Sequence, residues 1–225
     1  MTDRSQRSTL AVVPARGGSK RIPRKNIRPF DGQPLLARTL QILIEADLFD
    51  RVVVSTDDSE IARISTEAGA EVPFVRPAPL ADDHTPTPDV IKHAIATIED
   101  MSDVGFDYVC AVYPTAVLVT ADDLRSAFRE LRESHCEFVF TATSFGYPVQ
   151  RGLRRLPAGG CEMIDPSTRF VRSQDLEPVF HDAGQFCWGR TRAWLDDLDI
   201  FAPHSRMHLL PRHRVQDIDT PEDWE

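Results

Sequence analysis

The sequence predicts a single α/β domain with a mainly parallel sheet and helices on both faces of that sheet. Two observations carry this prediction. Short apolar runs alternate with amphipathic helical patterns over roughly the first 145 residues, and this alternation is typical of parallel sheets covered by helices. A basic segment with two adjacent glycines also follows the first apolar run directly, which is where such sheets bind their ligands.

The expected strands are short, continuous apolar or β-branched runs, as in strands buried on both faces. They cover residues 8–15, 51–56, 71–75, 108–113 and 137–144. The expected helices have apolar side chains at helical spacing and cover residues 34–48, 57–70, 89–100 and 120–134. Asp57 and Glu60 form a capping-box pattern at the start of the second helix, and Thr120 is a cap for the fourth.

The alternation stops after residue 145. Residues 145–184 are irregular and rich in proline, glycine and arginine, without a core of their own. We therefore expect one domain over residues 1–225 with a small inserted lobe at about 145–184. Beyond the lobe, we expect a return strand, a short helix, two late strands and the start of a last helix, at residues 184–189, 190–198, 206–211, 213–219 and 220–225.

The composition excludes several classes of function. A formal net charge of −9 argues against a nucleic-acid partner, because a phosphate backbone needs a broad basic face. No apolar stretch approaches a membrane span, so we expect no membrane partner, and the run from Leu10 to Val13 is too short for a signal peptide. The four cysteines form no Cys-x-x-Cys pair, which predicts reduced thiols and a cytoplasmic protein rather than a zinc or dithiol site.

Positive charge is concentrated in one loop after the first strand. Residues 16–28 contain six cations and no acid: Arg16, Lys20, Arg21, Arg24, Lys25 and Arg28. Gly17 and Gly18 lie among them, and glycines let the backbone approach an anion and expose its N–H groups. The loop fits neither the Walker A pattern nor GxGxxG, but the same physics predicts binding of a small phosphate-bearing ligand. The alternative is a solvated basic loop.

Two carboxylates near the end of the chain form a second charged pattern. Asp217 and Asp219 are separated by Ile218, so on the expected last strand both acids face one side while Ile218 faces the core. One or two carboxylates together with substrate phosphates suit Mg²⁺, which retains several of its waters. The alternative is a carboxylate pair that caps the helix starting at Thr220.

The segment VVPARGGSKRIPRKNIRPFDGQPLL (residues 12–36) resembles the opening signature of the sugar-acid cytidylyltransferases. The segments VVSTDD, FVRPAPLADDHTPT, YPTA and QDIDTPED follow in the order typical of that family, over nearly the whole chain. The resemblance implies a Rossmann-like nucleotidyltransferase fold and an enzyme that transfers CMP from CTP to the anomeric hydroxyl of a keto-sugar acid. It also implies Mg²⁺ as cofactor and a homodimer in which the lobe is a dimerisation element.

The resemblance assigns roles at matching positions. It implies catalytic roles for Arg16, Lys20, Lys25 and Asp217, and Mg²⁺ ligands at Asp217 and Asp219. The implied nucleotide-binding residues are Ala15, Arg16, Gly17, Gly18, Ser19, Lys20, Lys25 and Asn26 in the loop, with Arg76, Asp83 and Thr87 around the cytidine. The implied sugar-binding residues, partly supplied by a partner subunit, are Tyr113, Arg172, Gln174, His181, Asp182 and Gln185.

Within the family, the run RSQDLEPVFHDAGQFCWG (residues 172–189) resembles the enzymes for pseudaminic acid, a nine-carbon sugar acid. Tyr113 departs from the sialate enzymes, which tend to have glutamine there, and Val117 stands where proline is common. Activation of legionaminic, N-acetylneuraminic or 3-deoxy-manno-octulosonic acid remains the alternative. A different class, a non-catalytic nucleotide-binding protein, is disfavoured because Lys20, Asp217 and Asp219 are all present.

Overall fold

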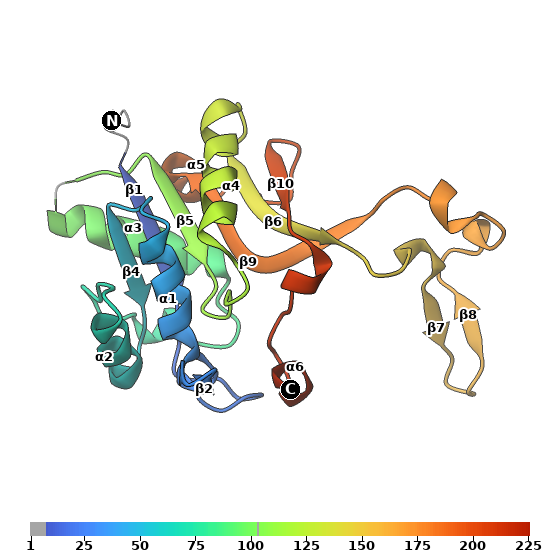
Figure 1. The fold of residues 1–225 in the computed structure, drawn as a ribbon, viewed down its shortest axis with the longest axis horizontal. Helices are drawn as coiled ribbons and strands as arrows, with labels where there is room; N and C mark the ends of the chain where they lie inside the picture. The colour runs from blue at the N-terminus through green and yellow to red at the C-terminus, as the bar shows by residue number, and fades with distance from the viewer. Residues whose placement is uncertain (1–7, 103) are drawn as a thin grey trace.

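A six-stranded sheet forms the centre of the protein in a computed structural model that describes residues 8–102 and 104–225 (Figure 1). Its strands, in the order β10-β6-β9-β5-β1-β4, are β10 (Ser205–Leu209), β6 (Phe138–Ser144), β9 (Phe180–Arg190), β5 (Tyr108–Val112), β1 (Thr9–Pro14) and β4 (Arg51–Ser55). The pairs β4–β1, β1–β5 and β6–β10 are parallel, and β9 runs antiparallel to both neighbours. The predicted mainly parallel sheet is therefore confirmed.

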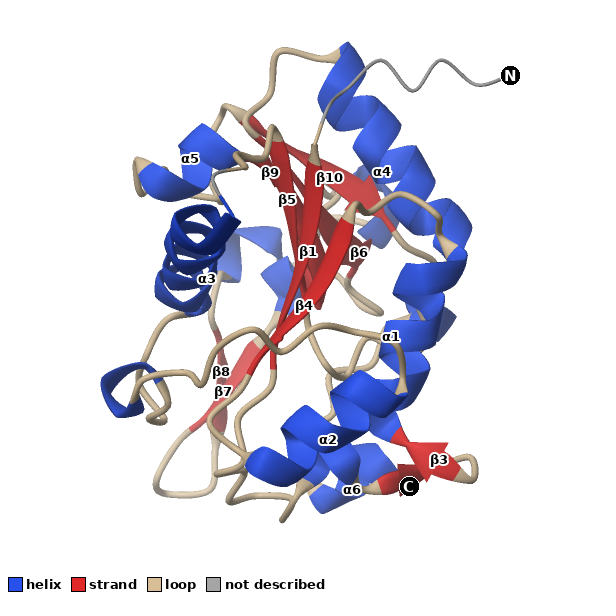
Figure 2. Cartoon of the chain, turned by 90° about the vertical axis from the view of Figure 1, so that its left-hand side faces the viewer, coloured by secondary structure: helices blue, strands red, loops and turns tan. Residues whose placement is uncertain are grey.

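Helices cover both faces of this sheet (Figure 2). One face packs against α1 (Leu35–Glu45), α2 (Ser59–Glu67) and α4 (Ala121–Glu133), and the other against α3 (Thr87–Ser102) and α5 (Thr191–Leu195). The alternation of side chains along β1 explains the two layers, because Ala11 and Val13 enter the first core while Leu10 and Val12 enter the second. Both layers follow from apolar strands that have no polar face.

Short elements complete the chain. The hairpin of β2 (Pro29–Phe30) and β3 (Gln33–Pro34) turns at Asp31 and Gly32, both with positive φ, and α6 (Pro221–Trp224) ends the chain. Turns of 3₁₀ helix lie at Lys25–Ile27, Ala78–Leu80, Val149–Arg151, Pro166–Thr168, Ser173–Asp175 and Arg212–Arg214. No helix within the described residues is long and apolar enough to cross a membrane.

The chain between β6 and β9, residues 145–179, extends away from the sheet and is called the lobe below (Figure 1). It contains an antiparallel hairpin of β7 (Leu153–Arg155) and β8 (Cys161–Met163). Several of its large apolar side chains are exposed, among them Leu153 at 63%, Ile164 at 61% and Phe170 at 91%. The lobe therefore offers apolar surface that its own chain does not cover.

Three sequence predictions about elements were wrong in detail. Residues 71–75 form only two isolated bridges, one to Val53 in β4 and one to Thr56 just after it, because Pro73 cannot donate a ladder hydrogen bond. Residues 213–219 form no strand, since Pro211 closes β10 and starts a 3₁₀ turn instead. The N-cap of α2 is Asp58 rather than Asp57, and its carboxylate accepts from the N–H groups of Glu60 and Ile61.

Candidate active site

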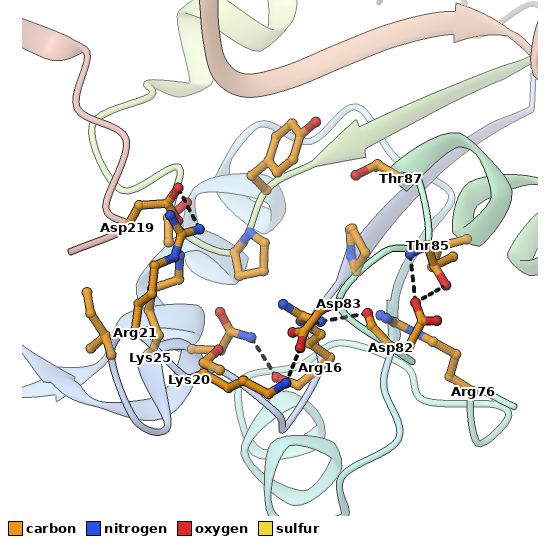
Figure 3. Close-up of a pocket in the computed structure, with 18 of the residues that line it drawn as sticks. Arg16, Lys20, Arg21, Lys25, Arg76, Asp82, Asp83, Thr85, Thr87 and Asp219 are labelled. Atoms are coloured by element: carbon orange, nitrogen blue, oxygen red, sulfur yellow. Dashed lines mark hydrogen bonds and ion pairs between the residues drawn. The ribbon is translucent and has the colours of Figure 1, made fainter. Parts of the chain in front are cut away.

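A cavity of about 410 Å³ opens beyond the carboxyl ends of β1 and β5 (Figure 3). The polar residues and the strand-end residues that line it come mainly from four segments: the basic loop (Arg16, Ser19, Lys20, Arg21, Lys25 and Asn26), the loop before α3 with the first residue of that helix (Arg76, Asp82, Asp83, Thr85 and Thr87), the loop after β5 (Tyr113, Pro114 and Thr115) and the acidic pair (Asp217 and Asp219). The structure thus brings together most of the nucleotide and metal residues that the sequence predicted. Ala15, Gly17 and Gly18 lie in the same loop without lining the cavity.

The basic loop is held in a defined shape at its start. The N–H of Ala15 donates to Ser55 O at 2.9 Å, and the buried Asn26 amide donates to Arg16 O at 3.0 Å. A Cβ on Gly17 would lie 2.6 Å from Oδ2 and 2.9 Å from Cβ of Asp58, so only glycine fits there. Asn26 therefore supports the loop.

Two acids that follow β4 form hydrogen bonds with the basic loop, a role that the sequence did not reveal. Asp57 Oδ1 accepts from the N–H of Gly17 at 3.0 Å, so this N–H, which we expected to face an oxyanion, is already bonded. Asp58 accepts from Arg24 Nη1 at 2.5 Å, and that bond lowers the pKa of Asp58 below its usual value. Arg24 has φ 57° and is tied to α2. One of the six cations is thus structural.

Asp83 neutralises two of the cations that were assigned to phosphate. Its carboxylate lies 2.6 Å from Arg16 Nη1 and contacts Lys20 Nζ (Figure 3). Hydrogen bonding to Lys20, with the charge of Arg16, lowers the pKa of Asp83. Arg16 also donates to Asp82 O at 2.6 Å. An incoming polyanion would therefore exchange one carboxylate for several phosphate oxygens at these two side chains.

Arg76 is a buried cation on the wall of the cavity, with only 4% of its surface exposed. Its guanidinium donates to the hydroxyl and main-chain oxygens of Ser55, and no carboxylate lies within ion-pairing distance among the described residues. Burial lowers the pKa of Arg76 to about 10, with Asp57 opposing and Arg16 adding to the shift. A buried guanidinium without a direct counter-ion favours an acceptor or anion in the cavity.

The acidic pair lies in residues 215–219, called the acidic segment below. Ile218 is buried against Ile22, Leu35 and Val117, while Asp217 and Asp219 both line the cavity. The predicted alternation is therefore present without the predicted strand. Asp219 lies 2.9 Å from Arg21 Nη2 and 3.1 Å from Lys25 Nζ.

The acidic pair fits a divalent cation that shares its ligands with a substrate. Desolvation in the cavity, together with the charge of Asp219, raises the pKa of Asp217, which is exposed and has no ion-pair partner among the described residues. No group of three or more metal-ligating side chains exists in the described part of the chain. Two carboxylates are nevertheless a sufficient protein contribution for Mg²⁺ when phosphate and water supply the remaining oxygens.

Tyr113 lies at the end of β5, next to an irregularity between β6 and β9. Its N–H donates to Gln185 O at 2.9 Å, and Gln185 stands where the register between these strands shifts. Burial raises the pKa of Tyr113, the hydroxyl of Thr87 opposes the shift, and the charge of Asp182 adds to it. Gly184 has φ +59° in this irregularity. The segment HDAGQF thus shapes the wall beside Tyr113.

The other predicted sugar residues lie outside this cavity. Gln185 is buried with its amide bonded to Ala183 O at 3.0 Å, and the ring of His181 contacts Asp182 O at 2.8 Å on the exposed start of β9. Arg172 and Gln174 belong to the lobe, where Arg172 pairs with Asp175 at 2.7 Å. Tyr113 is the predicted sugar residue that lines the cavity of its own chain.

Comparisons with known proteins agree with this geometry. A model of the cytidylyltransferase family matches residues 10–188. The chain is 42% identical to the pseudaminic acid cytidylyltransferase of Campylobacter jejuni, over 96% of this chain and 93% of that protein. It is 31% identical to the CMP-N,N'-diacetyllegionaminic acid synthase of Legionella pneumophila, over 96% of this chain and 92% of that protein.

A solved structure of CMP:2-keto-3-deoxy-manno-octonic acid synthetase in complex with CTP is also similar, with a TM-score of 0.68. That likeness covers 96% of this chain and 94% of the other at 14% identity, and it shows the fold alone. The family match and the Campylobacter relative confirm the resemblance found in the sequence. The chain belongs to the cytidylyltransferase family.

Proposed function

We propose that this protein transfers CMP from CTP to the anomeric hydroxyl of pseudaminic acid and releases pyrophosphate, as a cytoplasmic enzyme of 225 residues in one domain. One observation carries the nucleotide half of the proposal: a cavity at the carboxyl ends of parallel strands places several cations opposite two carboxylates. The sugar half is supported by 42% identity to the Campylobacter jejuni protein named for pseudaminic acid.

In this proposal the basic loop binds the triphosphate. Within residues 15–20, Arg16, Ser19 and Lys20 would face the phosphates, with Arg16 and Lys20 exchanging Asp83 for phosphate oxygens, while Ala15, Gly17 and Gly18 would shape the loop behind them. Lys25, at 19% side-chain exposure, would face the departing pyrophosphate from the other side. Arg76 and Thr87, with Asp83 once released, would line the cytidine end, where a buried guanidinium suits a carbonyl acceptor of the base.

The chemistry then depends on position and charge. The sugar hydroxyl attacks the α-phosphorus of CTP in line and loses its proton to water, the new P–O bond forms, and the bond from the α-phosphorus to the oxygen bridging to the β-phosphate breaks, which releases pyrophosphate. Arg16, Lys20 and Lys25 stabilise the negative charge that develops on pyrophosphate. Mg²⁺ held by Asp217 and Asp219 would neutralise phosphate charge and lower the pKa of the attacking hydroxyl. The reaction requires no covalent intermediate on the protein.

We further propose a homodimer in which the lobe of one subunit reaches the cavity of the other. Arg172 and Gln174 lie on the lobe and do not line the cavity of their own chain. The exposed apolar side chains of the lobe, such as Phe170, support this proposal because a partner subunit would cover them. Tyr113, His181, Asp182 and Gln185 would then complete the sugar site near β9 with the two residues of the partner lobe. Arginine suits a sugar carboxylate because two N–H groups of its planar guanidinium can bind both carboxylate oxygens at once.

A second candidate substrate is a legionaminic acid, supported by the 31% identical Legionella pneumophila relative. Pyrophosphate release with CTP and Mg²⁺ decides between the substrates. We expect turnover with pseudaminic acid and little with legionaminic or N-acetylneuraminic acid. Preference for either of the other two acids would retain the nucleotide site and overturn the sugar assignment. No pyrophosphate release with any of the three acids, while CTP still binds, would favour a non-catalytic nucleotide-binding protein.

A further inference from the structure

The carboxylate of Asp123 serves two purposes in the structure. It completes the capping box of α4, where the N–H and hydroxyl of Thr120 donate to Oδ2 at 2.9 and 2.7 Å. Both of its oxygens also accept from the guanidinium of Arg214, at 2.5 and 3.0 Å. The cap alone would need one oxygen, so the fork from Arg214 is a separate, long-range interaction.

The surroundings make this pair a firm contact. The side chain of Asp123 is 12% exposed and that of Arg214 is 26% exposed. Burial by itself would raise the pKa of Asp123, but the His208 ring at 3.8 Å and the hydrogen bonds from Arg214 and Thr120 outweigh burial and hold the pKa well below its usual range. The fork from Arg214 and the cap of α4 therefore both favour the ionised form of Asp123.

Arg214 connects two segments of the site to α4. It lies three residues before Asp217, at the end of the 3₁₀ turn that precedes the acidic segment. Its Nη1 also donates to Leu118 O at 3.3 Å, in the loop that continues from Tyr113 after β5. One guanidinium thus joins the cap of α4, the loop after β5 and the start of the acidic segment.

The acidic segment has few other restraints. Within the described residues, the N–H groups of Gln216, Asp217 and Ile218 donate to no main-chain carbonyl. Burial of Ile218 holds the segment in place. Lys25 Nζ also donates a hydrogen bond to Ile218 O at 2.5 Å, and the N–H of Asp219 donates one to Asp223 Oδ2 at 3.1 Å. Near its start, the N–H of Val215 donates to Arg212 O at 3.2 Å, Gln185 Nε2 donates to Gln216 O at 3.5 Å, and Gln216 Nε2 donates to Asp223 Oδ1 at 3.0 Å. Arg214 adds the ion pair with Asp123 at this near end.

We propose that Arg214 and Asp123 are positioning residues. They fix the start of the acidic segment so that the carboxylates of Asp217 and Asp219 both face the cavity and can hold one metal ion. Neither residue lines the cavity, so both act through the segment and not on substrate. The inference rests on the proposed role of the two carboxylates in holding Mg²⁺. Residues that orient metal ligands in this way typically change metal affinity 10 to 100-fold when they are removed.

The test compares Arg214→Gln with Arg212→Gln, which lies in the same turn, is exposed and does not contact Asp123. In Arg214→Gln we expect amide hydrogen exchange at residues 216–219 to rise several-fold without any ligand. The Mg²⁺ concentration for half-maximal pyrophosphate release should rise about tenfold. CTP binding without Mg²⁺ should stay within about twofold, because the basic loop is unchanged. Arg212→Gln should match the native protein in all three measurements.

Two further variants sharpen the test. Asp123→Asn should reproduce the shift in Mg²⁺ dependence, and the double variant should be no worse than Arg214→Gln alone, since both break one interaction. Arg214→Lys, which retains the charge but not the fork, should recover part of the Mg²⁺ affinity. These variants separate a positioning role from a general loss of folding.

Unchanged amide hydrogen exchange at residues 216–219 in Arg214→Gln overturns the proposal, whether or not the melting temperature falls. Asp217→Ala, measured in parallel, separates this inference from the proposed function. If Asp217→Ala retains Mg²⁺-dependent turnover while Arg214→Gln speeds hydrogen exchange at residues 216–219, the proposed Mg²⁺ role of Asp217 is wrong, and the proposed positioning role of Arg214 is supported. If Asp217→Ala abolishes turnover while Arg214→Gln changes neither hydrogen exchange nor Mg²⁺ dependence, the positioning role of Arg214 is wrong, and the Mg²⁺ role of Asp217 is retained.

Discussion

The ammonium of Lys25 donates to the main-chain carbonyl oxygen of Ile218 at 2.5 Å and lies 3.1 Å from the carboxylate of Asp219. The basic loop therefore holds the acidic segment directly, although 193 residues separate Lys25 from Ile218. The two charged patterns that the sequence displays at opposite ends of the chain form a single electrostatic unit.

Replacement of Lys25 should affect turnover more than folding. Lys25→Ala removes a bond to the acidic segment and one cation from the proposed pyrophosphate site, so we expect kcat to fall more than about tenfold. Lys92→Ala, which removes a surface lysine paired with Asp197, is the control and should stay within about twofold. Steady-state pyrophosphate release measures both variants, and an equal effect in the two would remove Lys25 from the site.

Removal of the charge of Asp217 should stabilise the fold and abolish activity, because the pKa of this carboxyl is raised in the folded protein. A carboxyl whose pKa is higher in the folded state than in the unfolded state binds protons more tightly when folded, so its ionisation destabilises the fold as the pH rises. Asp217→Asn should therefore raise the melting temperature near neutral pH, and the gain should vanish below the ordinary pKa of aspartate. The same variant should lose Mg²⁺-dependent turnover. Thermal melts across pH check the first outcome, and a melting temperature that falls at neutral pH contradicts it.

The two adjacent glycines should respond differently to the same substitution. Gly17→Ala would place a Cβ 2.9 Å from Cβ of Asp58, so we expect about 1–3 kcal/mol of destabilisation and weaker CTP binding. Gly18→Ala meets nothing within 4 Å and should leave the free energy of unfolding nearly unchanged. Urea unfolding of both variants provides the comparison. Equal stability of the two would show that Asp58 moves aside without cost.

A shared active site predicts complementation between two inactive variants. Lys20→Ala disables the nucleotide end of a site, whereas Arg172→Ala disables the lobe that we propose to serve the partner. A mixed dimer would contain one site with both defects and one site with neither, so it should recover about half of the native activity. Co-expression with two different tags isolates the mixed dimer. Activity no higher than in either parent would place Arg172 in its own chain's site or outside the site altogether.

The sequence predicted the sheet and the charged clusters because both depend on short-range patterns. Apolar runs of five or six residues identified β1, β4 and β5, and the period of two around Ile218 placed Asp217 and Asp219 on one side. The strand predicted for residues 213–219 did not form because a strand needs a neighbour, and Pro211 turns the chain away from β6. Asp217 and Asp219 nevertheless face the same side, because burial of Ile218 between them is enough to set this alternation.

The remaining features depend on contacts between residues far apart in sequence. Asp57 and Asp58 read as a helix cap, and the sequence contains no signal that Asp58 fills the space beside Gly17. Asp123 likewise reads as a cap, and its bond to Arg214 spans 91 residues. The pattern of a cap is local, but the second use of the same carboxylate is set by tertiary packing.

The lobe leaves the sheet at the end of β6 and returns at the start of β9, and Ser144 pairs with Phe180 at its base. Both ends of the lobe therefore stand on neighbouring strands, like an extended hairpin loop. A loop closed in this way can change in length at little cost, since closure entropy grows only slowly with length. Over evolutionary time, the lobe can be exchanged for another without moving β1, β4 or β5. With the lobe in its proposed role at the sugar site, substrate choice and nucleotide chemistry would be free to diverge independently within one fold.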